Sequence, residues 1–226
     1  KFEVLDMGSF WYSETPSAPG SKGWDSYSPR MCNWVHFRIR ANGREFYHFN
    51  SHFDHIGTTA RAESAKLLVA KVREIAGGKP AFCTGDFNSN QNTEAYKTIA
   101  GSGILADSYV RCPSKTNGDW PTYNGYKYIS TPPAAASRID HVFVTPKDTK
   151  VVSWRIVNNS YNRKYPSDHF PDVLHLFIIG IILIQRGLLS PTLKMNPVHP
   201  FFQKFLWRLV RKSQGIRAVN GNFTCG

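Results

Sequence analysis

The chain has 226 residues, of which 41% are hydrophobic, and carries a formal net charge of +12. This composition is ordinary for a globular protein, and the length allows one large domain or two small ones. The cysteines Cys32, Cys83, Cys112 and Cys225 form no CxxC pair, which excludes zinc-ribbon and thioredoxin-type sites.

The charge is unevenly distributed along the chain. Residues 1–172 hold 21 Lys and Arg against 16 Asp and Glu, whereas residues 173–226 hold seven basic residues and no acid. A mild basic excess suits an anionic partner such as a phosphate ester or nucleic acid, although many other proteins share it. We therefore expect one domain at 1–172, followed by an atypical basic and apolar tail that does not belong to its core.

The first fifty residues predict a strand, a loop and a hairpin. Residues 2–7 alternate as a strand does, and they resemble the middle of a strand, so we expect an N-terminal portion upstream. A loop rich in Ser, Pro and Gly leads to a predicted strand at 34–40. The pair Asn42-Gly43 is a strong hairpin signal, and the return strand is predicted at 45–51.

A helix is predicted at 59–76, where apolar residues recur at helical spacing, and Gly77-Gly78 ends it. A short buried strand at 80–83 follows, so strand–helix–strand indicates a crossover and a parallel or mixed sheet. Residues 91–100 suggest a short helix.

The last part of the predicted domain begins with a long loop at 111–137, which is rich in Pro, Gly, Ser and Thr. Two strands are predicted at 139–145 and 151–158. The apolar run at 173–184 is shorter than the about 20 residues that a membrane helix needs, so we expect no span. Its first residues, 173–177, could add one more strand, and few contacts with the core are expected from about Gln185 onward.

Polar residues follow the buried strand before Asp86. In an extended segment Asp86 and Asn88 would leave on the same side, and Gly85 would allow a sharp turn or a close backbone approach. The carboxylate could orient a water or hold a divalent cation. Taken alone, the segment is more typical of a turn, because Gly, Asp and Asn are common turn residues.

A second cluster ends the hairpin. His52 could donate to a phosphate oxygen or transfer a proton, and the alternative is an ordinary loop histidine. Asp54 could orient His52 or cap the helix that follows. His55 is interpreted as a solvated loop residue.

Two further clusters contain acids next to strands. Asp140 begins a predicted strand, where a carboxylate is costly unless it is paired with an imidazole or closes a structural hydrogen bond. Asp168 and His169 lie between two prolines, so His169 could be a base or a donor and Asp168 a metal ligand. For this pair alone, a polar turn is the default interpretation.

Arg30 precedes a strand and could bind a phosphate, although a solvated arginine is the more frequent case. The aromatic residues could line a substrate groove or simply pack in the core; they are Trp11, Tyr12, Trp120 and Tyr123. Together the four clusters supply carboxylates, imidazoles and an amide. Phosphoester hydrolysis needs this inventory, because it uses a cation, an oriented water and donors for the developing charge.

The order of these motifs resembles the endonuclease/exonuclease/phosphatase superfamily. The motifs are Asn50-Ser51-His52, then residues 84–88, then Ser137-Arg138-Ile139-Asp140, then Ser167-Asp168-His169. The sequence is most similar to a bacterial, Bacteroidetes-type branch over about residues 1–172. The resemblance implies an α/β fold, a four-layer sandwich of two mostly antiparallel sheets flanked by helices, incomplete here at its N-terminus.

The resemblance also implies phosphodiester or phosphomonoester hydrolysis that depends on Mg²⁺ or Mn²⁺. By this resemblance Asp86 and Asn88 orient the water and the phosphate, and Asp86 also contributes to the metal site. His169 contacts the phosphate, and Asp140 orients His169. The remaining roles are the metal site for Asp168 and phosphate contacts for His52, Arg30 and Asn88.

This sequence departs from the family pattern in two places. A metal-binding Glu that the family carries in its first half is not in the chain, and the pattern ends near Pro171. We expect a monomer acting on a phosphate ester, with nucleic acid as one candidate substrate. The alternatives are a phosphatase for a small or lipid-borne phosphate and an inactive, truncated anion-binding domain.

Overall fold

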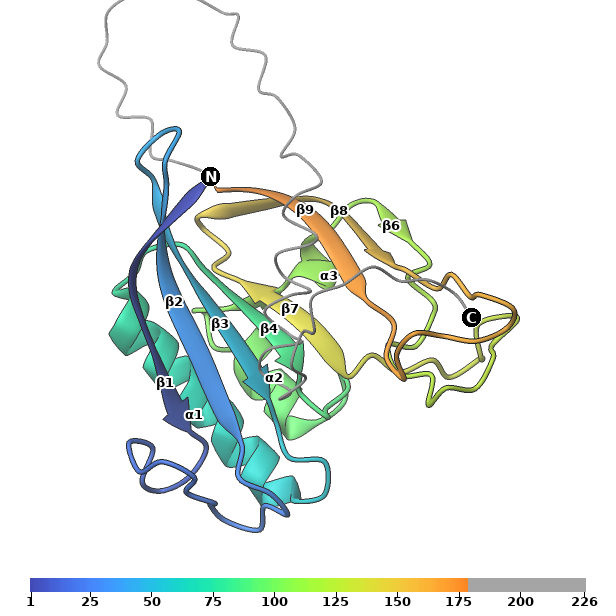
Figure 1. Cartoon of the computed structure of the whole chain (residues 1–226), viewed down its shortest axis with the longest axis horizontal. Coiled ribbons are helices and arrows are strands. Elements are labelled where there is room, and N and C mark those ends of the chain that lie inside the picture. The colour runs from blue at the N-terminus through green and yellow to red at the C-terminus, as the bar shows by residue number, and fades with distance from the viewer. Residues whose placement is uncertain (179–226) are drawn as a thin grey trace, which may run out of the picture. The chain divides into compact units, whose positions relative to one another are not determined.

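The computed structural model describes residues 1–178, and these residues form a mixed α/β fold with two sheets flanked by helices (Figure 1). The elements are β1 Phe2–Trp11, β2 Met31–Ile39, β3 Glu45–His52, α1 Thr58–Ala76, β4 Ala81–Asp86, α2 Glu94–Ala100, β5 Ala106–Asp107, α3 Ser108–Arg111, β6 Lys115–Thr116, β7 Asp140–Val144, β8 Thr149–Ile156 and β9 Asp172–Ile178.

The larger sheet has six strands in the order β1-β2-β3-β4-β7-β5. Its neighbours are antiparallel except for β3 and β4, which are parallel and joined by α1. The predicted crossover is therefore confirmed, as is the hairpin between β2 and β3. In its turn Gly43 has φ 70°, and the Gly43 amide donates to the Ile39 carbonyl over 2.8 Å.

The helix α1 covers one face of this sheet, and Figure 1 shows it behind strands β1, β2 and β3. Its buried residues include Leu68 and Val72, which join Phe49 of β3, Cys83 of β4 and Ile99 of α2 in one hydrophobic core. The helix ends at Gly77, which has φ 56° and donates its amide to the Arg73 carbonyl. The apolar stripe and the terminal glycines thus do what the sequence predicts.

The second sheet has three strands in the order β6-β8-β9. Its strand β9 pairs antiparallel with β8 from Asp172↔Ile156 to Ile178↔Thr149. The strand expected at 173–177 is therefore present. Residues 179–226, which hold the rest of the expected tail, lie outside the described part of the chain, and the domain boundary at 172 stays a prediction.

Three short elements are not among the sequence predictions: β5, α3 and β6, which have two, four and two residues. Runs of this length show no periodicity that a sequence could reveal. The buried Asp107 joins β5 and α3. It ends β5 and caps α3 by accepting the Tyr109 amide over 2.8 Å. Within the described residues, no helix has the length and apolar character to cross a membrane.

Candidate active site

Asp86 is the last residue of strand β4. In the register of the larger sheet it lies opposite His52 of β3 and Asp140 of β7. Gly85, directly before it, has φ 149°, and a Cβ there would lie 1.8 Å from the Ser51 carbonyl oxygen. The expected close backbone approach is therefore real, because only a glycine lets β3 and β4 come together next to the site.

Asn88 reaches Asp86 by a turn, so the extended segment assumed from the sequence ends earlier, at Asp86. Asn88 has φ 46°, and its amide donates to Asp86 Oδ1 over 2.8 Å. Its side-chain Nδ2 donates to the Phe53 carbonyl over 3.0 Å and lies 3.4 Å from Asp86 Oδ2. The turn, rather than strand alternation, brings the carboxylate and the amide together.

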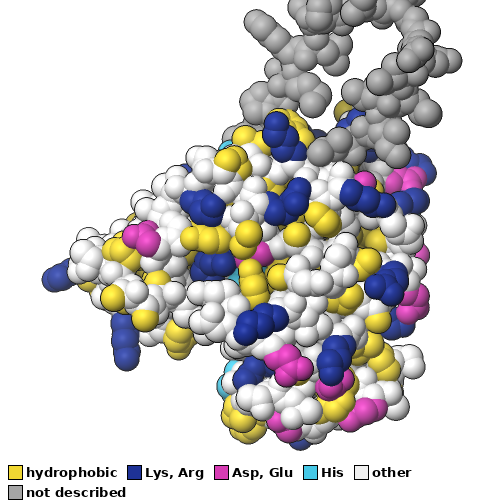
Figure 2. Space-filling model, turned by 180° about the vertical axis from the view of Figure 1, so that it is seen from behind, with side chains coloured by type: hydrophobic (Ala, Val, Ile, Leu, Met, Phe, Trp, Pro, Cys, Tyr) yellow, Lys and Arg dark blue, Asp and Glu magenta, His cyan; other side chains and the backbone are white. Residues whose placement is uncertain are grey.

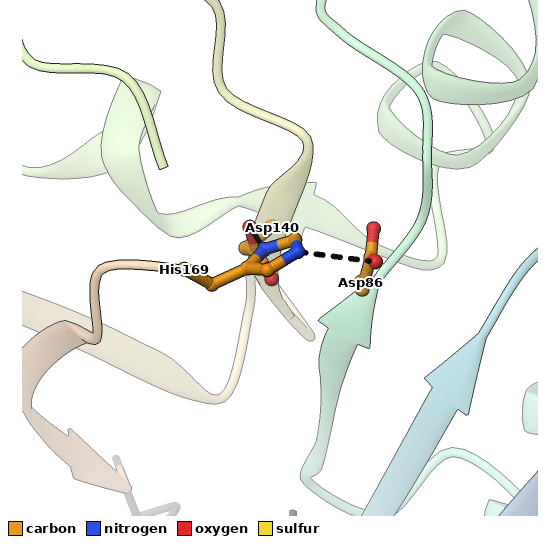
Figure 3. Close-up of side chains that lie close together, drawn as sticks. All are labelled: Asp86, Asp140 and His169. Carbon is orange, nitrogen blue, oxygen red and sulfur yellow. Dashed lines mark hydrogen bonds and ion pairs between the residues drawn. The ribbon is translucent and has the colours of Figure 1, made fainter. Parts of the chain in front are cut away.

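His169 lies between two carboxylates (Figure 3). Its Nδ1 donates to Asp140 Oδ2 over 2.8 Å, and its Nε2 lies 3.8 Å from Asp86 Oδ2. The side chains of His169 and Asp140 are 25% and 17% exposed, so solvent reaches the imidazole but screens the pair only partly. The predicted orientation of His169 by Asp140 thus has its geometric basis.

This environment shifts the pKa values of both His169 and Asp140. Burial lowers the pKa of His169, but the hydrogen bond to Asp140 and the charges of Asp140 and Asp86 outweigh it and raise the pKa to about 9. Burial raises the pKa of Asp140 to about 6, against the effect of its hydrogen bond with His169. At neutral pH the pair is therefore an imidazolium and a carboxylate, and Nε2 carries a proton.

His52 approaches Asp86 from the other side, with Nε2 3.4 Å from Asp86 Oδ2. Burial lowers the pKa of His52 more than the charge of Asp86 raises it, and the positive charge of Arg30 lowers it further. Two imidazoles thus face one carboxylate, and at neutral pH they differ in protonation.

Asp54 does not orient His52. Its Oδ2 accepts the amides of Ile56 and Gly57 over 3.0 and 2.8 Å, at the turn before α1. Asp54 does not cap α1 either, because the N-cap is Gly57 and the first-turn amides of Thr59 and Ala60 donate to Asp25. The Asp54 carboxylate also lies 3.4 Å from the Arg30 guanidinium, which donates to His55 Nδ1 over 2.9 Å.

Asp168 is outside the central cluster as a side chain. Its backbone carbonyl accepts the amides of Asn124 and Gly125 over 2.7 and 3.1 Å, and its negative charge contributes to the raised pKa of His169. Its expected role as a metal ligand stays a prediction.

Thr122 is a supporting residue that the sequence analysis did not identify. It is fully buried, and its hydroxyl oxygen accepts the amides of Ile139 and Asp140 over 2.9 and 3.0 Å. It therefore fixes the backbone that carries Asp140. No local signal predicts this, because Thr122 lies in a loop and its partners are 17 and 18 residues away.

Two of the aromatic residues that could line a groove or pack in the core differ in burial. Tyr12 is buried in the core, with its hydroxyl 2.7 Å from Ser51 Oγ. Tyr123, in contrast, is 51% exposed and its ring lies against His169.

Among the described residues, one set of acids and histidines has the separation of metal ligands: Asp86, Asp140 and His169, with one ligand atom of each within 4.8 Å of the others. Two carboxylate oxygens suit a hard divalent cation, whereas His169 in its imidazolium form has no free lone pair for a metal, so Asp86 and Asp140 are the candidate ligands. The charge of Asp86 contributes to the raised pKa of Asp140, and a cation would relieve this crowding of negative charge. The residues therefore fit a divalent metal ion.

Comparisons with known proteins agree with this geometry. The structure of a mannosyl-6-phosphatase from Bacteroides thetaiotaomicron matches with a TM-score of 0.73 and 40% identity, covering 79% of this chain and 68% of that one. An endonuclease/exonuclease/phosphatase protein from Bacteroides vulgatus matches with a TM-score of 0.70 and 36% identity, covering 79% and 67%.

A more distant relative is Nocturnin of Drosophila melanogaster, 26% identical over 65% of this chain. The chain spans only 28% of the length of that protein. Residues 9–169 match the Endonuclease/Exonuclease/phosphatase family, and these residues contain every cluster described above. The chain belongs to the Endonuclease/Exonuclease/phosphatase family, in the branch represented by the Bacteroides proteins.

Proposed function

We propose that this protein is a divalent-metal-dependent phosphoesterase whose reaction takes place between His169 and Asp86. One observation carries the proposal: Asp140 holds His169 by Nδ1 over 2.8 Å, so that Nε2 faces the Asp86 carboxylate across 3.8 Å. An imidazolium aimed at a carboxylate offers a donor for a phosphate oxygen beside an acceptor for a water.

Each residue then has a role that follows from its protonation. His169, held as an imidazolium, donates to the phosphate and stabilises the charge that develops in the transition state. Asp86 accepts a proton of the attacking water, and Asn88, tied to Asp86 and Phe53, keeps this carboxylate in place. His52, whose pKa is lowered, supplies a neutral donor on the opposite side of Asp86.

Asp86 and Asp140 would hold the metal, and His169 would lie beside it and contact the phosphate. The same proposal assigns Asp168 to a metal contact and Arg30 to a phosphate contact. A bound Mg²⁺ or Mn²⁺ would neutralise phosphate charge and polarise the phosphorus–oxygen bonds.

The substrate that we favour is a small phosphomonoester. A solved relative with 40% identity is described as a mannosyl-6-phosphatase. On the face seen in Figure 2, Lys and Arg side chains are scattered among other residues, so this face offers no continuous positive track for nucleic acid. Nucleic acid remains the second candidate, and a lipid-borne phosphate the third.

Hydrolysis of three substrates separates a monoesterase from a diesterase or nuclease: phosphate is measured from mannose 6-phosphate, p-nitrophenol from bis(p-nitrophenyl) phosphate, and shortening of the strand for a single-stranded oligonucleotide. The measurement is made with Mg²⁺, with Mn²⁺ and with a chelator. We expect hydrolysis of the monoester with either metal and none with the chelator. If calorimetry shows that the protein binds the metal but no substrate is hydrolysed, the result would instead support the inactive anion-binding domain.

A further inference from the structure

A tyrosine lies directly beside the proposed reacting imidazole. Tyr123 forms an isolated antiparallel bridge with His169, and the two ring centroids are 5.1 Å apart at an interplanar angle of 64°. Tyr123 is 51% exposed, and its ring contacts the imidazole of His169. A large part of its ring is therefore open next to the site.

The exposure of Tyr123 does not come from a loosely held loop. The residues on either side, Thr122 and Asn124, are 0% and 5% exposed. The Thr122 carbonyl accepts the Phe170 amide over 2.7 Å, and the Asn124 amide donates to the Asp168 carbonyl over 2.7 Å. The backbone that carries the tyrosine is thus fixed to the segment that carries His169.

The ring is also held in its own orientation. Gly125 has φ 58°, and a Cβ there would come within 3.1 Å of the Tyr123 hydroxyl oxygen. A glycine at this position therefore lets the phenol end lie over the backbone. The Asn124 side chain donates to the Ser167 carbonyl over 3.2 Å and closes the turn below the ring.

We propose that Tyr123 is a specificity-determining residue whose ring packs against a single ring of the alcohol that is esterified to the substrate phosphate. The inference rests on the proposed function, because a phosphate bound at His169 must direct its ester group past a neighbouring side chain. The face of a tyrosine ring carries partial negative charge and attracts the C–H face of a sugar or the face of a base. One exposed ring in this contact accommodates one ring of the substrate.

The test measures binding and turnover in the same sample. Phosphorus NMR titrations give dissociation constants for mannose 6-phosphate, uridine 5′-monophosphate, glycerol 3-phosphate and inorganic phosphate, and the same spectra show whether an ester is hydrolysed. For Tyr123→Ala we expect 5- to 20-fold weaker binding of one or both ring-bearing esters. Binding of glycerol 3-phosphate and of inorganic phosphate should change less than twofold.

Two further variants control the result. Tyr123→Phe keeps the ring and should bind as the wild type does, and Tyr161→Ala removes another exposed tyrosine, 71% exposed, without effect. The inference is overturned if Tyr123→Ala binds all four probes as the wild type does, if it weakens all four equally, or if the wild type binds none. Binding that follows the expected pattern without release of phosphate would support the role of Tyr123 and reject the proposed hydrolysis.

Discussion

The protonation of His169 depends on Asp140, which places the proton where the proposed chemistry needs it. The carboxylate accepts from Nδ1 and so leaves Nε2 as the free donor. An amide at position 140 could donate instead of accept, and it would no longer compensate the imidazolium charge.

Asp140→Asn should therefore reduce the turnover of a phosphomonoester about 10²- to 10⁴-fold, the usual contribution of one positioned proton-transfer group or charge donor. Thermal unfolding of the same sample shows that the fold is retained. The exposed Asp119→Asn is the matched control and should behave as the wild type. Turnover of Asp140→Asn within threefold of the wild type would remove Asp140 from the mechanism.

Thr122 supports the same residue through the backbone. Thr122→Val keeps the size of the side chain but leaves the part-buried amides of Ile139 and Asp140 without their acceptor. An unpaired buried donor costs about 1–3 kcal/mol, and solvent satisfies a part-buried one in part, so the free energy of unfolding in urea should fall by about 1 kcal/mol. Thr122→Ser retains the hydroxyl and should recover most of the loss. Equal stability of the valine and serine variants would show that the hydroxyl contributes nothing.

At this scale the sequence predicts which residue types carry the chemistry, but not all of their contacts. His52, Asp86, Asp140 and His169 come together because each lies at the end of a strand or next to one. Thr122 could not be found in this way, since its partners are 17 and 18 residues away and no periodicity marks a long loop.

The pairing of β3 and β4 encloses a buried polar chain that leads toward the site. The Thr84 hydroxyl donates to Asn50 Oδ1 over 3.0 Å, so its oxygen accepts the proton of His48 Nε2 over 2.8 Å. His48 is 5% exposed, and burial lowers its pKa from 6.5 to about 4. The imidazole is therefore neutral in the folded protein at neutral pH.

A histidine with a lowered pKa makes the folded state less stable in acid. Below pH 6.5 the unfolded chain takes up a proton that the folded chain accepts only near pH 4, so stability is lost as the pH falls through this window. Between pH 7 and pH 5 we expect His48 to account for a loss of about 2 kcal/mol.

Urea unfolding at both pH values measures this loss, and His48→Gln keeps a donor for Thr84 but cannot titrate. The glutamine variant should lose correspondingly less stability than the wild type over the same interval. The same pH dependence in both proteins would mean that other groups carry it.

The elements themselves are well predicted where the pattern is long. The helix α1, the β2–β3 hairpin and the crossover to β4 follow from apolar spacing, Asn-Gly and paired glycines. Strand β5, helix α3 and strand β6 arise from tertiary contacts instead. The hydroxyl of Tyr96 and the guanidinium of Arg138 both reach Asp107, over 2.8 and 3.1 Å, where β5 and α3 meet.

For the molecule as a whole, the site exists only when distant segments are folded together. Asp86 ends β4, Asp140 begins β7, and His169 lies in the segment before β9. Family membership and fold were predictable from the order of the motifs. The sequence left two interpretations for the segment after β4, a turn and strand alternation, and the structure shows that a turn joins Asp86 to Asn88.

The central claim is that His169 acts on a phosphate ester beside Asp86. The most direct test measures phosphate release from mannose 6-phosphate with Mn²⁺ by the wild type and by His169→Ala, together with the thermal midpoint of each protein. We predict that the wild type releases phosphate, that the variant is slower by about 10²- to 10⁴-fold, and that its fold persists. A wild type that is inactive on every phosphate ester, or a folded His169→Ala that is as fast as the wild type, would contradict it.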